Sequence, residues 1–249
     1  MCWQGERETM TVFSLNLNKI ALLRNSRGGD EPNLSDFARK AITAGVRSLT
    51  VHPRADARHI TLDDVVTLAR LPELASGAVE LNIEGDLRAE LITLVETLRP
   101  SQFTVVPVTP GEVTSDRGWR AYDPHAELRR TVERLAGIRV AVFCDATNES
   151  CDYAVAAGAC AIELYTGPFA KAFKTGTHPA ELMALRQTAD HARQLGLRVN
   201  AGHDLTLENL PALRAVVEID EVSIGHHVTI DALHMGWTAA LAAYIHACR

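Results

Sequence analysis

The sequence is poor in cysteine and in aromatic residues. Its five cysteines are an odd number, lie scattered along the chain, and include no close pair of the kind that binds structural zinc or forms a redox centre. We therefore expect free, reduced thiols. Phe, Trp and Tyr make up only 5% of the residues, whereas proteins that bind single-stranded nucleic acid depend on stacked aromatic side chains. These shortages argue against a disulfide-stabilised miniprotein and against a single-strand-binding protein.

The sequence also lacks an excess of positive charge and any long hydrophobic run. Its 25 Lys and Arg against 31 Asp and Glu give a formal net charge of −6, which argues against a broad nucleic-acid-binding face. No stretch approaches the roughly 18 to 20 apolar residues that span a bilayer, and residues 1–9 lack the apolar centre of a secretory signal. We therefore expect a soluble, cytoplasmic protein with no nucleic-acid or membrane partner. Any anionic ligand must be bound by a local cluster of donors.

The chain has 249 residues, of which 47% are hydrophobic, so it is long enough for one large core. No low-complexity linker interrupts it. Short apolar runs alternate with segments of helical period, and eight of these runs are candidate strands: 12–18, 48–52, 79–84, 103–106, 139–143, 160–164, 197–200 and 221–224.

Segments with a 3.6-residue apolar period lie between the candidate strands. One stripe runs from Leu34 to Ile42 and stops before Gly45, and another, from Leu87 to Leu98, stops before Pro100. A third includes Leu182, Leu185, Ala189 and Ala192 and follows Pro179, and Thr61 with Asp64 resembles a capping box. We expect a last helix that carries Leu233, Trp237, Leu241 and Tyr244.

Eight strands alternating with helices over about 250 residues favour a (β/α)₈ barrel of the α/β class with additional helices, the TIM barrel, in which active sites lie at the carboxyl ends of the strands. A doubly wound open sheet is the alternative. The strands themselves favour the barrel because one face of each is polar: Ser14, Asn16 and Asn18 in the first, Thr50 and His52 in the second, and Glu80, Asn82 and Glu84 in the third. Polar groups inside a barrel carry a desolvation cost unless they are paired or line a cavity, so this pattern indicates a site.

The residues best suited to chemistry fall after the candidate strands, in the segments 16–29, 50–60, 82–85, 106–116, 162–167, 199–205 and 222–226. In this order, these segments resemble the pyridoxine 5′-phosphate synthase family of vitamin B6 biosynthesis, over nearly the whole chain. The resemblance implies a TIM-barrel enzyme that joins 3-amino-2-oxopropyl phosphate to 1-deoxy-D-xylulose 5-phosphate. The implied products are pyridoxine 5′-phosphate, inorganic phosphate and water, and no cofactor or metal is implied. We expect residues 1–10 to form a flexible tail and residues 11–249 a single catalytic domain.

Ring closure between an aminoketone and a ketose phosphate needs several proton transfers near neutral pH, for which imidazoles and carboxylates with shifted pKa values are suited. The resemblance implies that His52 and Glu84 accept protons, that His203 donates one, and that Glu163 stabilises charge in the transition state.

Two phosphates must also be bound, and barrels commonly bind phosphate at the loops after the seventh and eighth strands. The resemblance implies contacts to the aminoketone phosphate from Asn16, Arg27, Asp204, Gly225 and His226, and contacts to the deoxyxylulose phosphate from Asn18, Lys19, Arg54, His59 and Thr114. Arg24 and Arg58 are not in this set, since surface arginines are usually only solvated, and His227 is expected to be a packing or surface residue.

The chain departs from the family pattern at two places. Many members carry Asp-His where this chain has Asn18-Lys19, and some carry Gly where it has Asp204. A lysine can still meet a phosphate as a point charge, and the charge of Asp204 would repel a phosphate if it pointed inward.

Three other functions are weighed against the synthase. A metal-dependent barrel hydrolase would be expected to place a His pair on the first strand, which here ends in Asn16 and Asn18. An imine-forming aldolase would need a lysine at a strand end, and no lysine closes the sixth or seventh candidate strand. A silent vitamer-phosphate binder would not need the acid–base set. The resemblance further implies a homo-octamer, for which the amphipathic stretch around Trp237 could supply contacts or simply pack on the barrel.

Overall fold

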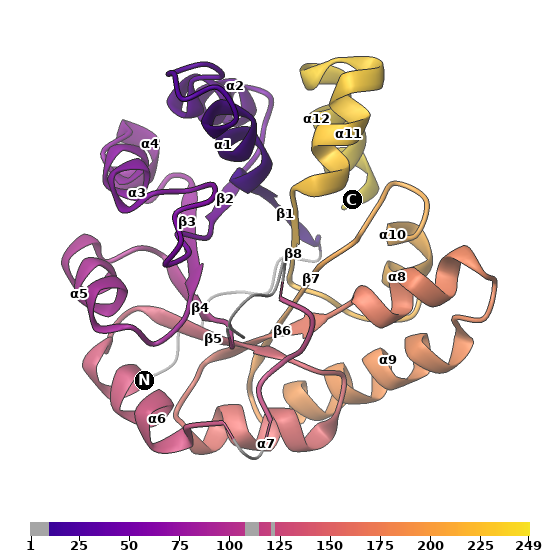
Figure 1. Ribbon diagram of the computed structural model, residues 1–249. Coiled ribbons are helices and arrows are strands. Elements are labelled where there is room, and N and C mark those ends of the chain that lie inside the picture. Colours follow the sequence, from indigo (N-terminus) through magenta and orange to yellow (C-terminus); the bar gives the residue numbers. More distant parts are fainter. Residues whose placement is uncertain (1–9, 108–114, 121–122) are drawn as a thin grey trace.

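Eight parallel strands close into a barrel in the computed structural model of the chain, which describes residues 10–107, 115–120 and 123–249 (Figure 1). Each strand pairs with the next in the chain, and β1 pairs with β8 to complete the ring. The closed barrel predicted from the sequence is confirmed, and the open doubly wound sheet is wrong. The tail predicted over residues 1–10 lies outside the described residues except for Met10.

The strands fall within two residues of the predicted ranges. They are β1 (Val12–Asn16), β2 (Ser48–Val51), β3 (Glu80–Gly85), β4 (Gln102–Val105), β5 (Arg139–Cys144), β6 (Ala161–Tyr165), β7 (Arg198–Gly202) and β8 (Glu221–Ile224). Two strand ends differ by two residues: β7 runs on to Gly202, beyond the predicted 200, and β1 was predicted to reach Asn18. It ends earlier because Leu17 leaves the extended conformation, with φ −89° and ψ 1°, and begins a helix.

The helices surround the strand ring (Figure 1). They are α1 (Asn18–Asn25), α2 (Leu34–Thr43), α3 (Leu62–Ala69), α4 (Pro72–Ala75), α5 (Ala89–Leu98), α6 (His125–Arg134), α7 (Asn148–Ala156), α8 (Gly167–Lys174), α9 (Pro179–Gln194), α10 (Leu210–Arg214), α11 (His226–Met235) and α12 (Trp237–Ala247). No helix in the described ranges is long and apolar enough to cross a membrane. Among these residues the four cysteines are free thiols: Cys144, Cys151, Cys160 and Cys248.

The helix signals read from the sequence are present in the structure. The stripe of α2 buries Leu34, Ala38 and Ala41. In α3 the capping box is complete, since the Thr61 hydroxyl accepts from the backbone N–H of Asp64 and the Asp64 carboxylate accepts from the N–H of Thr61.

The predicted last helix is two helices. Gly236 adopts φ 88° and ψ 153°, a conformation open to glycine alone, and separates α11 from α12. The prediction that one helix carries both Leu233 and Tyr244 is therefore wrong: Leu233 belongs to α11 and is 80% exposed, whereas Tyr244 of α12 is fully buried against Phe13. In Figure 1 these two helices stand beside α1 and α2, and α1 contacts α11 as α12 contacts α2.

The barrel interior is polar, as the strand pattern predicts. Ser14 bonds to Thr50 at 2.7 Å and to Ser48 at 2.9 Å. The amide of Asn82 donates to the Thr50 hydroxyl at 3.3 Å, and the Thr104 hydroxyl donates to Asn82 at 3.0 Å. A hydrogen-bond network thus fills the centre of the barrel, while the apolar core lies between strands and helices, where Leu15, Leu49, Ile83 and Phe103 are buried.

Candidate active site

A cavity of about 500 Å³ opens at the carboxyl ends of the strands. The residues that line it come from loops after most of the strands, and they include most of the residues that the sequence singled out. These are Asn16, Asn18, Lys19, His52, Arg54, His59, Glu84, Glu163, His203, Asp204, Gly225 and His226.

Two of the predicted residues are not in this set. Arg27 follows α1, is exposed and does not line the cavity. Thr114 lies outside the described residues. Conversely, Arg58 and His227, which were predicted to be surface or packing residues, line the cavity, as does Ser223, which was not among the predicted site residues. Arg24, also set aside, binds Asp64 through both guanidinium nitrogens at 2.5 and 2.8 Å and is a structural residue that links α1 to α3.

Glu84 and His52 form the centre of the site. Glu84 ends the inward face of β3, and its Oε2 lies 3.6 Å from Nδ1 of His52, which follows β2. Ser223 of β8 donates to Glu84 Oε1 at 3.4 Å, and Asn16 of β1 donates to Oε2 at 3.5 Å. With His52 after β2, residues from three neighbouring strands therefore surround this carboxyl group. Both side chains are almost completely buried.

Burial sets the charge of this pair. It raises the pKa of Glu84 to about 7, against 4.5 for an exposed glutamate. It also lowers the pKa of His52 well below its usual value, helped by the positive charges of Arg54 and Arg88. His52 is therefore neutral near pH 7, and its buried Nε2 has no hydrogen-bond partner among the described residues. The pair offers a neutral imidazole beside a carboxyl group that can gain or lose a proton.

Glu163 is the second buried carboxyl group, at the inward end of β6. Burial and the nearby Glu84 and Glu221 raise its pKa well above the usual range. Glycine at 202 on β7 makes room for it, since a Cβ there would lie 2.3 Å from Glu163 Oε1. The buried site thus favours the protonated form of Glu163, which can donate a hydrogen bond.

Cationic and neutral donors gather on one side of the cavity, in the segments after β1 and β2. Lys19, Arg54, Arg58 and His59 all line it. Burial lowers the pKa of His59 to about 4, with contributions from Arg54 and Lys19. The backbone N–H of Ile60 donates to His59 Nδ1 at 2.9 Å, so the proton of the neutral ring is on Nε2.

The N-terminus of α11 also lines the cavity, next to the end of β1. The helix begins at His226, directly after Gly225, and the first N–H groups of a helix favour an anion. A Cβ at Gly225 would lie 2.5 Å from the backbone oxygen of Asn16, so glycine allows the end of β8 to approach the end of β1. Burial and the charge of Lys19 lower the pKa of His226, which favours the neutral ring.

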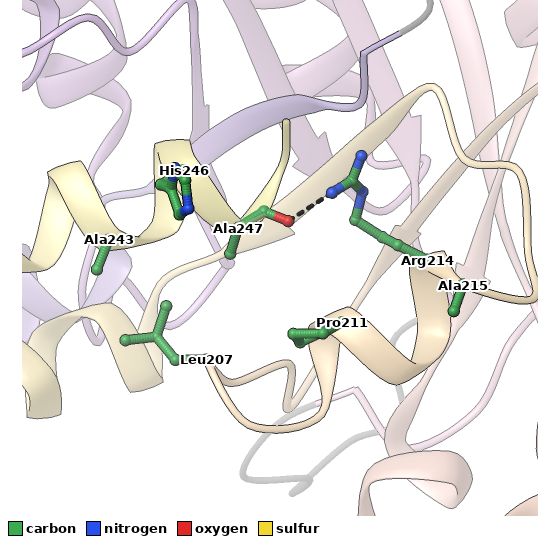
Figure 2. Close-up of a pocket in the computed structure, with 7 residues that line it drawn as sticks. All are labelled: Leu207, Pro211, Arg214, Ala215, Ala243, His246 and Ala247. Atoms are coloured by element: carbon green, nitrogen blue, oxygen red, sulfur yellow. Dashed lines mark hydrogen bonds between the residues drawn. The ribbon is translucent and has the colours of Figure 1, made fainter.

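A second hollow lies far from this chemistry, between α10 and α12 (Figure 2). Its titratable side chains are Arg214 and His246, and the guanidinium of Arg214 already donates to the carbonyl of Ala247 at 2.6 Å. This groove has no carboxyl group and no paired imidazole, so the cavity at the strand ends is the candidate active site.

Comparison with known proteins agrees with this geometry. The model of the family described as pyridoxal phosphate biosynthesis protein PdxJ matches residues 13–249. The chain is 43% identical to pyridoxine 5′-phosphate synthase of Agrobacterium fabrum, over 95% of this chain and 96% of the relative. It is 44% identical to the enzyme of the same name from Xanthomonas axonopodis pv. citri, over 94% of this chain and 95% of that one.

Solved structures show the fold alone. A 4-hydroxy-2-oxoglutarate aldolase/2-deydro-3-deoxyphosphogluconate aldolase superposes with a TM-score of 0.64 at 16% identity and covers 97% of this chain and 96% of its own. Phosphoribosyl anthranilate isomerase from Thermotoga maritima superposes with a TM-score of 0.62 at 13% identity, over 96% of this chain and 98% of its own.

The fold, the buried acid–base groups and these similarities define a biosynthetic enzyme of the (β/α)₈ barrel class. Within that class, the chain belongs to the PdxJ family, whose curated members are pyridoxine 5′-phosphate synthases of vitamin B6 biosynthesis.

Proposed function

We propose that the enzyme condenses 3-amino-2-oxopropyl phosphate with 1-deoxy-D-xylulose 5-phosphate to pyridoxine 5′-phosphate, inorganic phosphate and water. The observation that supports this best is the buried Glu84–His52 pair, 3.6 Å apart, in a cavity that also holds Glu163, His203 and a cluster of cations. Imine formation, elimination and ring closure each move a proton, and these groups are suited to that work.

Glu84 and His52 are proposed to accept protons. A base works best when its pKa lies near the working pH, and burial raises that of Glu84 to about 7. His52 is neutral there, so its imidazole can take a proton and share it with the carboxyl group 3.6 Å away. His203 is proposed to donate a proton to a leaving group.

Glu163 is proposed to stabilise negative charge that develops on the substrate. A carboxylate would repel such charge, but the raised pKa of Glu163 keeps it protonated near pH 7. A neutral carboxylic acid in an apolar site can donate a hydrogen bond to an oxyanion. The role therefore requires the protonated form.

Two phosphates are proposed to bind at two places in the cavity. Asn18, Lys19, Arg54, His59 and Thr114 are the proposed contacts for the deoxyxylulose phosphate, to which His59 would donate from Nε2. Asn16, Gly225 and His226 are the proposed contacts for the aminoketone phosphate near the N-terminus of α11. Arg27, which does not line the cavity, and the backbone of Asp204 are proposed as its further contacts. One phosphate leaves as inorganic phosphate and the other stays in the product.

Turnover by purified, chelator-treated protein tests the proposal. Both phosphorylated substrates are supplied, and pyridoxine 5′-phosphate is followed by fluorescence and inorganic phosphate by a coupled assay. Equal amounts of the two products support the synthase. Binding of pyridoxine 5′-phosphate without turnover would favour a silent binder, and activity that appears only with added metal on other substrates would favour a hydrolase.

The enzyme is also proposed to be a cytoplasmic homo-octamer built from one catalytic domain over residues 11–249. Trp237 packs edge-on against Phe37 of α2, with ring centroids 4.9 Å apart, so it packs within the subunit. The exposed Leu233 and Met235 of α11, a helix that contacts α1 with its exposed Leu23, are better suited to contacts between subunits.

A further inference from the structure

The turn after β7 holds two consecutive non-glycine residues in the left-handed region. His203 has φ 90° and Asp204 has φ 57°. Side chains with a Cβ occupy this region at a cost in free energy, and such strain persists only where the surroundings impose it. Two strained residues in succession at the mouth of the cavity call for a physical reason.

Buried side chains from two other elements fix the backbone of this turn. The Thr166 hydroxyl, after β6, donates to the carbonyl of Gly202 at 2.7 Å or to that of His203 at 2.5 Å, and the Thr166 N–H also donates to Gly202. The Asn209 amide, at the start of α10, donates to the Asp204 carbonyl at 3.1 Å. Both Thr166 and Asn209 are buried. The conformation is therefore built into the fold.

The consequence of this turn is a contact between the two side chains. Asp204 Oδ2 lies 3.2 Å from Nδ1 of His203, and the ring edge of His203 faces Tyr165 with centroids 5.1 Å apart. Nδ1 is buried, so Nε2 is the nitrogen that can serve a ligand in the cavity. The imidazole thus has a carboxylate within ion-pair distance of Nδ1 on one side and an aromatic ring on another.

The charges around Asp204 favour its ionised form. The contact with His203 lowers the pKa of Asp204, and His227 and His226 add to this effect. Glu84 and Lys19 are the other charged groups here that line the cavity. Tyr165 covers the other side of the imidazole, and its pKa is raised mainly by burial and then by the charge of Asp204. Within this set, Asp204 is the carboxylate in contact with the histidine proposed to donate a proton.

We propose that Asp204 is a positioning residue for His203: its carboxylate, 3.2 Å from Nδ1, accepts from Nδ1–H, fixes the orientation of the ring, and favours the doubly protonated imidazolium whose Nε2–H is the proton given to the substrate. This inference rests on the proposed role of His203 as proton donor, and it replaces a direct contact between the Asp204 side chain and a phosphate. Carboxylates orient imidazoles in the same way in other active sites, where the partner acts through the histidine.

Two variants separate the charge of Asp204 from the strain of the turn. Asp204→Asn keeps the shape of the side chain and tolerates the left-handed conformation, but removes the charge. Asp204→Gly removes the side chain and also the strain. Glu208→Gln is the matched control because Glu208 is exposed, lies in the same loop and loses the same charge without contacting His203.

We expect kcat to fall about tenfold or more in both Asp204 variants, with KM within about twofold of the wild type. Asp204→Gly should unfold at a higher temperature than the wild type and yet turn over more slowly, which a purely structural role would not produce. Unchanged kcat in Asp204→Gly, or a large rise in KM at constant kcat, would overturn the proposal.

Nitrogen-15 NMR of the resting enzyme tests the geometry without turnover, with the His203 signals assigned by their loss in His203→Gln. We expect the proton of the neutral ring on Nδ1 in the wild type and in Glu208→Gln, and a shift toward Nε2–H in Asp204→Gly. An Nε2–H tautomer in the wild type would refute the inference. Because this measurement needs no substrate, a failure of the proposed synthase activity can be told apart from a failure of the proposal about Asp204.

Discussion

Glu84, Glu163 and Glu221 are three carboxyl groups buried inside one barrel. Burial raises the pKa of each, to about 7 for Glu84 and for Glu221, because a carboxylate loses hydration when it leaves water. The same desolvation that makes Glu84 a base near neutral pH also makes its ionisation unfavourable for the folded state. Function and stability are thus linked at single residues.

The stability of the folded protein should therefore depend on pH through Glu84. Its pKa rises from 4.5 to about 7 on folding, so the folded state binds more protons than the unfolded state between these values. The free energy of unfolding of the wild type, relative to Glu84→Gln, should fall as pH rises across this window, by about 3 kcal/mol in total. Urea unfolding of both proteins at pH 5 and pH 8 measures it, and a constant difference would contradict the raised pKa.

Glu84→Gln should also lower kcat about 10²- to 10⁴-fold, because an amide cannot accept the proton. The fold should survive, since glutamine has nearly the same shape and can still bond to Ser223. Steady-state kinetics and circular dichroism check both statements. Glu90→Gln, on the exposed face of α5, is the control for loss of one negative charge. Wild-type turnover in Glu84→Gln would remove Glu84 from the mechanism.

Strand periodicity predicts some site residues well and others not at all. Glu84 and Ser14 lie on the inward face because side chains alternate along a strand, and this alternation can be read from the sequence. Arg27 and Arg58 lie in loops, where no period tells which way a side chain points. Their contrasting positions, Arg27 outside the cavity and Arg58 at its lining, depend on contacts such as the Arg58–Asp56 ion pair at 2.5 Å.

The elements around the cavity are joined at close approaches that only glycine permits. The end of β8 meets the end of β1 at Gly225, and the N-terminus of α11 follows directly. The position of that helix end, and of His226 upon it, therefore depends on the absence of a single Cβ.

Gly225→Ala should weaken substrate binding more than it weakens the fold. The added methyl group would lie 2.5 Å from the Asn16 carbonyl oxygen and would push β8, Asn16 or the start of α11 aside. We expect KM for the aminoketone phosphate to rise about tenfold or more, through loss of helix N-terminal donors to the phosphate. Gly29→Ala is the control, since a Cβ there meets no atom within 4 Å. Equal KM values in the two variants would contradict this role of α11.

Elements whose ends carry a local signal could be predicted, and those defined by packing could not. The Thr61–Asp64 capping box and the apolar stripe of α2 need only their own residues. The separation of α11 from α12 could not be predicted from local sequence, because a glycine within a helical pattern is often tolerated. The chain turns at Gly236 because α12 packs on the rest of the fold, with Tyr244 on Phe13 and Trp237 on Phe37.

At the scale of the whole molecule, the net charge of −6 conceals a concentrated group of cations. Lys19, Arg54 and Arg58 lie in two neighbouring segments at one end of the barrel. The order of eight strand and helix units along the sequence could predict the barrel, since few other folds have this order. The total charge could not reveal how charges are distributed on the barrel.

Leu233 is the most exposed of the large apolar side chains that the structure describes, at 80%, and we propose that it lies at a subunit interface. Leu233→Asp should reduce the mass of the particle in solution, because a charge there would be desolvated on assembly. Light scattering coupled to size exclusion measures the mass. Val155→Asp is the matched control: Val155 is an exposed apolar residue on α7, away from α1 and α11. An unchanged mass in Leu233→Asp would exclude this face from the interface.

The hydrogen-bonded centre of the barrel also limits how the protein can change during evolution. Exchange of Thr50 alone for an apolar residue leaves the buried amide of Asn82 without its acceptor and takes one of two hydroxyl partners from Ser14, at a cost of about 1 to 3 kcal/mol. Exchange of Ser14, Thr50 and Ser48 together still leaves the Asn82 amide unpaired, so only a replacement that includes Asn82 can be nearly neutral. Viable sequences with an apolar centre are therefore separated from this one by intermediates of lower stability, and directed evolution would reach them only by coordinated replacement.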